Sequence, residues 1–237
     1  MRWSIITLVL LLVGSLAYGD ENDENILGVL ARSQLARLDR AQAVDPTGPR
    51  ARTVRSSFET LTRVLGLRYP VELRVIGGDI VAETLQGRIV VANESLADLN
   101  ESERLFVLAH ELGHIELRHW EQTQRLYQKW VPGVVSPDQT EPVAALLGRE
   151  ASGLAYRQEF EADAFALHTL RALGGSSQDV VGAFMRMGAN HDTATHPGTG
   201  KRLAALRATD RARAGGGSSD LQPDTRNEPI DSVSRAD

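Results

Sequence analysis

The segment His110-Glu111-Leu112-Gly113-His114 constrains the fold of this chain more than any other part of the sequence. At about 100° of rotation per residue, positions four apart lie on one helix face, so both imidazoles can bind one ion. Glu111 then projects to the side where a water bound to that ion would lie. The apolar residues 105–109 precede the motif and predict a helix inside a domain core. Buried histidines need partners, so the pattern predicts a metal ion; the alternative is two hydrogen-bonded core histidines.

A third ligand must be a histidine or a carboxylate, because the chain of 237 residues contains no cysteine. A hydrolytic zinc site usually has three protein ligands and leaves the fourth position to water. The downstream candidates are the acidic residues of segment 159–163 and the isolated histidines His168, His191 and His196. The nearest of these histidines, His168, lies far beyond the motif helix, so a glutamate ligand fits better. On a helix Glu159 and Asp163 share one face, whereas Glu161 lies about 200° from Glu159.

These patterns predict one Zn²⁺ ion per chain, bound by His110, His114 and Glu159. Asp163 is then expected to accept a hydrogen bond from the free ring N–H of a ligating histidine. The alternative interpretation of the acidic segment is a solvated helix face.

The motif helix is predicted over residues 103–119, because Asn100 and Glu103 form a plausible capping box ahead of the apolar run. On one continuous helix His119 would lie about 180° from His110. We therefore expect His119 at the surface, near the helix end. Further helices are expected at 25–43, 54–65, 150–173 and 180–187, and strands at 70–75, 80–85 and 88–92.

The two ends of the chain are expected to lie outside the fold. Residues 1–19 read as a signal peptide cleaved after Gly19, since the apolar run 5–17 is shorter than the about 20 residues that span a bilayer. An N-terminal helical segment (residues 20–50) is expected to precede the domain that carries the metal-site motifs (51–207). The tail, residues 208–237, opens near a run of glycine and serine and has few large apolar residues, which predicts disorder.

Charge excludes one class of partner. The net charge is −5, and the 26 basic residues, with Lys129 and Lys201 as the only lysines, are spread along the chain rather than clustered. A nucleic-acid-binding protein would show a basic patch. We therefore expect no nucleic-acid partner, while the oligomeric state and peripheral association with a membrane stay open.

Three ordered motifs resemble peptidase family M48, which includes CaaX prenyl-protease, HtpX-like and Oma-like zinc endopeptidases. They are His110-Glu111-x-x-His114, Glu159-x-x-Ala162-Asp163, and Thr195-His196-Pro197 followed by Arg202. The resemblance covers about residues 53–206. It implies a zincin-like, gluzincin-type α+β fold, mostly helical with a small sheet, with Glu111 as catalytic base and His196 near the metal. Segment 80–87 departs from the family, lacking its Asn-Ala pair and Pro-Gly-Gly turn.

The resulting hypothesis is an exported, periplasmic or secreted zinc endopeptidase that acts on protein or peptide substrates in envelope protein quality control. His196 or Arg202 would stabilise the oxyanion, with His196 alternatively approaching the open metal position or only holding its loop. The peptide is expected to extend the sheet near residues 80–85. Two alternatives remain: a non-proteolytic, chaperone-like zinc protein in which His196 is a fourth ligand, and a protease that keeps its N-terminal membrane anchor.

Overall fold

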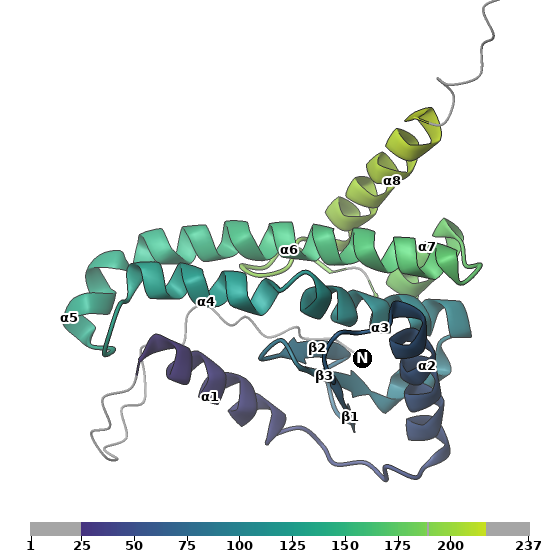
Figure 1. Cartoon of the computed structure of the whole chain (residues 1–237), viewed down its shortest axis with the longest axis horizontal. Coiled ribbons are helices and arrows are strands. Elements are labelled where there is room, and N and C mark those ends of the chain that lie inside the picture. The colour runs from purple at the N-terminus through teal and green to yellow at the C-terminus, as the bar shows by residue number, and fades with distance from the viewer. Residues whose placement is uncertain (1–24, 189, 217–237) are drawn as a thin grey trace, which may run out of the picture.

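The computed structural model describes residues 25–188 and 190–216, so the proposed signal peptide lies outside the described residues. Figure 1 shows a small sheet covered by helices, with a long helical hairpin extending to one side. The elements in chain order are α1 (Ile26–Leu38), α2 (Pro49–Leu65), β1 (Glu72–Ile76), β2 (Ala82–Leu85), β3 (Ile89–Asn93), η1 (Glu94–Asp98), α3 (Glu101–Glu116), α4 (His119–Trp130), α5 (Pro137–Thr140), η2 (Glu141–Val143), α6 (Ala144–Ala172), α7 (Ser177–Met187) and α8 (Thr199–Gly216). This is the mostly helical α+β architecture that the sequence predicts.

The sheet has the strand order β1-β3-β2, with β1 parallel and β2 antiparallel to β3. A tight turn joins β2 to β3, and both Gln86 and Gly87 have positive φ angles, as the hairpin geometry requires. Val90 packs into the larger apolar core, while Val91, on the opposite face of the strand, packs with Leu38 of α1. The sheet is therefore covered on both faces, and β2 forms one edge.

The large core lies between α2, α3, α6, α7 and the sheet. Helix α2 buries Val54, Phe58 and Leu61 and ends at Gly66, whose φ of 58° is left-handed, as a glycine C-cap allows. The capping box at the start of α3 is confirmed: Asn100 accepts from the Glu103 backbone N–H at 2.9 Å, and Glu103 accepts from that of Asn100 at 3.1 Å. Helix α3 is buried from Glu103 to Gly113, which confirms its prediction as a core helix.

Helix α6 crosses α3 at very close range because the contact residues are small. A Cβ placed on Gly113 would lie 3.0 Å from the Phe165 ring and 3.3 Å from the Ala162 backbone. Ala162 and Ala166 are themselves fully buried. Backbone contact therefore fixes the separation of the two helices.

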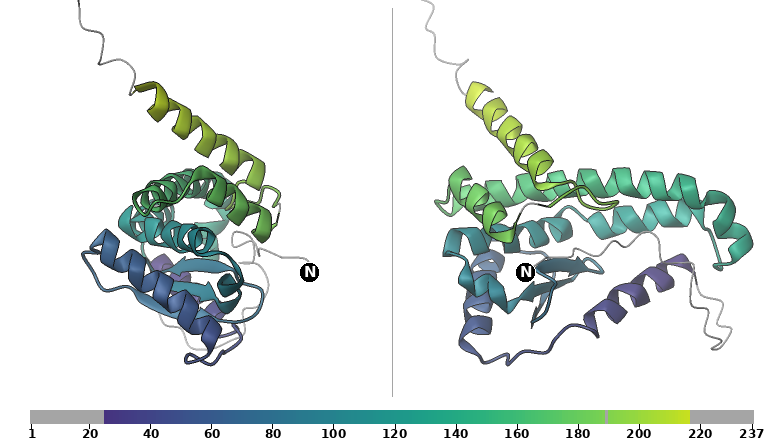
Figure 2. Two further views of the ribbon diagram at one scale, coloured as in Figure 1. Left: turned by 90° about the vertical axis from the view of Figure 1, so that its right-hand side faces the viewer. Right: turned by 180° about the vertical axis from the view of Figure 1, so that it is seen from behind.

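Helices α4 and α6 form the long hairpin that extends from the core, and Figure 2 shows it from behind. Residues 120–157 are thus mostly helical. Helix α8 projects from the body and continues to Gly216, beyond the expected domain boundary at residue 207. Alanine and arginine, the residues with the strongest helix propensity, are frequent there, which explains the extension. No helix among residues 25–188 and 190–216 is long and apolar enough to cross a membrane.

The close crossing predicts opposite effects for the same substitution at two helical glycines. Gly113→Ala forces α3 and α6 apart, and we expect it to lower the free energy of unfolding by about 1 kcal/mol or more. Gly153→Ala in α6 has open space, since only the Arg157 guanidinium lies near at 3.8 Å, so it should raise that free energy by about 1 kcal/mol. Urea denaturation of the two variants measures both effects. Equal stabilisation by both would show that the crossing is not tight.

Candidate metal centre

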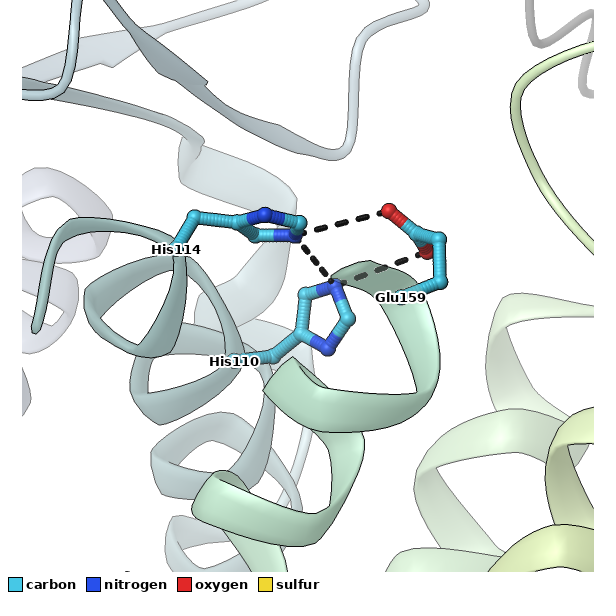
Figure 3. Close-up of side chains that lie close together, drawn as sticks. All are labelled: His110, His114 and Glu159. Atoms are coloured by element: carbon cyan, nitrogen blue, oxygen red, sulfur yellow. Dashed lines mark hydrogen bonds and ion pairs between the residues drawn. The ribbon is translucent and has the colours of Figure 1, made fainter. Parts of the chain in front are cut away.

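Two imidazoles from α3 point at one spot. His110 and His114 lie one turn apart, and their Nε2 atoms are 3.2 Å from each other (Figure 3). His110 is buried, because the helix that carries it lies in the core, and His114 is half-buried at the helix end. The spacing along α3 follows directly from helix geometry.

Helix α6 brings the carboxylate of Glu159 to the same spot. Its Oε2 lies 3.7 Å from His110 Nε2, and its Oε1 lies 3.4 Å from His114 Nε2. Ligand atoms about 2.0 to 2.1 Å from a tetrahedral zinc ion lie about 3.3 Å from one another. Among the described residues, His110, His114 and Glu159 form a group able to hold a metal ion. Two nitrogens and one carboxylate at this spacing fit zinc.

Asp163, one turn further along α6, joins the site to α8. Its Oδ1 lies 2.9 Å from His110 Nδ1, so His110 can present Nε2 to a metal. Arg202 of α8 donates two hydrogen bonds to the same carboxylate, at 2.8 and 2.5 Å, and its Nη1 lies 3.4 Å from Glu159 Oε2. Arg202 therefore compensates both buried carboxylates, and its Nη2 also lies 3.3 Å from His110 Nδ1.

The pKa values of the two buried carboxyl groups are shifted in the direction that keeps both groups ionised. Burial alone would raise the pKa of Glu159, but Arg202 and then His114 outweigh it and hold that pKa well below its usual range. The pKa of Asp163 is likewise lowered, because Arg202 outweighs the effect of burial. Both carboxylates are thus anionic and available to a cation or a ring N–H.

Glu111 is 7% exposed and contacts the edge strand β2. The Thr84 hydroxyl lies 2.9 Å from Glu111 Oε2 and 2.8 Å from the Glu111 carbonyl oxygen, and it can donate to either one. Sequence reasoning missed Thr84, because nothing in the local pattern shows which strand residue meets the motif helix. Its place opposite Val90 in the strand register, on the face that packs toward α3, accounts for the contact.

His196 comes from the loop between α7 and α8 and reaches the accessible side of the cluster. Its Nε2 lies 3.7 Å from Glu159 Oε1, its Nδ1 lies 2.8 Å from Thr195 Oγ1, and its side chain is 40% exposed. Burial lowers the pKa of His196, which favours the neutral imidazole. Of the two residues considered for the oxyanion, His196 is the accessible one, whereas Arg202 is bound to Asp163.

The expectation that His119 lies at the surface is wrong. Its exposed fraction is 3%, and its Nδ1 lies 2.8 Å from His114 Nδ1. Helix α3 ends at Glu116, and Arg118 adopts a left-handed conformation with φ of 56° before α4 begins. The rotation of 100° per residue therefore does not apply across this break, and the chain returns His119 to the motif. Burial, followed by the nearby His114, lowers the pKa of His119 to about 3.

Three comparisons relate the chain to known proteins. The family model described as peptidase family M48 matches residues 50–210, which include every candidate site residue. Among solved structures, the chain is similar to Ste24p of S. mikatae, at 19% sequence identity and a TM-score of 0.47. That match covers 75% of this chain and 54% of the Ste24p chain, so this chain spans about half the length of that protein. No curated protein matches the chain.

The ligand geometry predicts one zinc ion per chain, with Glu159 required for it. Glu159→Gln should lower zinc affinity by at least about 100-fold, since it removes an anionic ligand. Zinc at 100 times its Kd should stabilise the wild type by about 2.7 kcal/mol and leave the variant nearly unchanged. Metal analysis and thermal denaturation with and without zinc test this. Glu116→Gln, at an exposed position of the same motif helix, should behave as wild type.

The contacts of Arg202 predict a structural role. Arg202→Met leaves two buried carboxylates without their cation and should lower the free energy of unfolding of the metal-free protein by about 3 to 5 kcal/mol. Arg207→Met, at an exposed position of the same helix, should cost less than about 0.5 kcal/mol. Urea denaturation compares them, and equal stability of the two variants would contradict the assignment.

Proposed function

Because the chain belongs to peptidase family M48, we propose that it is a zinc-dependent endopeptidase that hydrolyses peptide bonds in protein substrates. Its fold is zincin-like, mostly helical with a small three-stranded sheet. The observation that carries the proposal is the convergence of His110, His114 and Glu159 at zinc-ligand spacing, with Glu111 on the same helix. A metal held by these residues supplies a Lewis acid that activates water and polarises the scissile carbonyl.

Glu111 is the general base in this proposal. Its carboxylate takes a proton from the attacking water and delivers it to the departing amine. The Thr84 hydroxyl, 2.9 Å from Glu111 Oε2, restrains the orientation of that carboxylate. Because Thr84 belongs to the edge strand, the position of the base is tied to the strand beside which a substrate would lie.

The sheet edge supplies the proposed substrate site. Among the described residues, β2 pairs only with β3, so an extended peptide can add to its other edge through main-chain hydrogen bonds. Such a mode places the scissile bond along the strand that contacts Glu111. Recognition through the main chain suits an enzyme that acts on unfolded segments of many sequences.

His196 is the proposed donor to the developing oxyanion, since its half-exposed ring lies beside Glu159. Arg202 instead fixes Asp163 and Glu159. The second candidate function rests on the same histidine: a fourth protein ligand would close the site and leave a non-proteolytic, chaperone-like zinc protein. Cleavage of an unfolded protein that a chelator abolishes and zinc restores would separate the two.

We propose export to the periplasm or secretion, and a role in envelope protein quality control, from the pattern of residues 1–19. Mass determination of the mature N-terminus distinguishes cleavage after Gly19 from a retained membrane anchor.

Replacement of the base tests the proposed chemistry. Glu111→Gln should keep its zinc and its fold but lower kcat/KM on unfolded casein by about 100- to 10,000-fold, the usual contribution of a general base. Glu116→Gln is the matched control, since it makes the same change on the exposed side of α3. Full activity of a folded, zinc-loaded Glu111→Gln variant would rule out this mechanism.

A further inference from the structure

The two histidine ligands of the proposed centre are held in different ways. A histidine that binds a metal through Nε2 carries its proton on Nδ1 and needs an acceptor there to fix the ring. His110 has such an acceptor in Asp163, at 2.9 Å. His114 has no carboxylate within ion-pair distance of its Nδ1 in the described structure, and the partner of that atom is His119 Nδ1, at 2.8 Å.

His119 continues the contact to a carboxylate on α6. Its Nε2 lies 3.2 Å from Oε2 of Glu161, while its Nδ1 faces His114. The rings of His114 and His119 meet edge to face, with centroids 4.9 Å apart and planes at 77°. The three side chains therefore form one continuous line from the metal centre to Glu161, whose side chain is 54% exposed.

When a metal is bound, one arrangement of the ring protons gives every imidazole nitrogen along this line a partner. His114 uses its Nε2 lone pair for the metal, so its Nδ1–H donates to Nδ1 of His119. A neutral His119 that accepts at Nδ1 carries its proton on Nε2 and donates it to Glu161. Each ring has one donor and one acceptor satisfied, and the final acceptor is anionic, which strengthens the whole chain.

The backbone holds His119 in place independently of its ring. Gln158 of α6 donates from Nε2 to the His119 carbonyl oxygen at 3.0 Å, one residue before the ligand Glu159. The left-handed Arg118 directs the first residue of α4 back over the end of α3. His119 is thus fixed between the two helices that supply the metal ligands.

We propose that His119 is a positioning residue of the metal centre, orienting His114 through a hydrogen-bond relay from His114 to His119 to Glu161. The inference rests on the proposed function, because the relay acts on a ligand of the proposed zinc site. Helix α6 then contributes a ligand, Glu159, and anchors both ligand histidines: His110 directly through Asp163 and His114 indirectly through Glu161.

Zinc affinity tests the relay without reference to activity. We expect His119→Phe to weaken zinc binding by about 10- to 100-fold, and Glu161→Gln, which keeps an acceptor but loses the charge, by a smaller factor of about 3- to 10-fold. Competition with a chromophoric chelator measures both Kd values on the full mature chain. Because both changes interrupt one relay, the double variant should bind no more weakly than His119→Phe alone.

Glu150→Gln is the matched control. Glu150 also lies on α6, and its Oε2 also accepts from an aromatic ring N–H, that of Trp130 at 3.0 Å, but it lies on the hairpin away from the centre. Its zinc affinity should equal that of the wild type. Wild-type affinity of both His119→Phe and Glu161→Gln, or multiplicative effects in the double variant, would overturn the relay. A wild type that binds no zinc would overturn the metal centre itself.

Histidine tautomers give a second readout that holds even if His119→Phe fails to fold. In the zinc-loaded, ¹⁵N-histidine-labelled wild type, NMR should show His119 neutral with its proton on Nε2 and His114 with its proton on Nδ1. In Glu161→Gln the His119 Nε2 and His114 Nδ1 resonances should both shift. A His119 proton on Nδ1, or a His114 resonance insensitive to Glu161→Gln, would contradict the proposal.

Discussion

The candidate site depends on one buried carboxylate, that of Asp163, which is 1% exposed. It accepts from His110 of α3 and from Arg202 of α8, and so connects three helices that are distant in the sequence. A buried charge without a partner is strongly destabilising, so the loss of one of these contacts destabilises the others. Glu159 and Asp163 carry two negative charges and Arg202 carries one positive charge. The net negative charge of these three side chains favours the binding of a divalent cation.

Features that follow from a single helix could be predicted from the sequence. His110 and His114 share a face of α3, and Glu159 and Asp163 share a face of α6, because the helical repeat fixes both relations locally. The apolar run before the motif likewise predicted a buried helix. His119 and Thr84 could not be found in this way. His119 follows a left-handed residue that changes the helical phase between α3 and α4. The contact of Thr84 is non-local, because it depends on which strand packs beside α3.

The centre combines rigid and accessible parts. The three proposed ligands stand on helices whose crossing is set by backbone contact at Gly113. His196 instead lies on the loop between α7 and α8, and Thr84 lies on the edge strand. In the proposed function a substrate would therefore lie along the loop and the strand, while the three metal ligands are carried by two packed helices. Sites on rigid elements keep their geometry more closely than sites on loops.

Helix α6 runs without interruption from Ala144 to Ala172 and carries Glu159, Glu161 and Asp163, three of the acidic residues that serve the centre. One residue inserted inside it, before Glu159, would turn that carboxylate by about 100° relative to the rest of the helix. Insertions at the tip of the hairpin, residues 131–143, leave the phase of these acids unchanged. Length variation between relatives should therefore accumulate at that tip, and the same place is where a fused domain or tag would do the least harm to the centre.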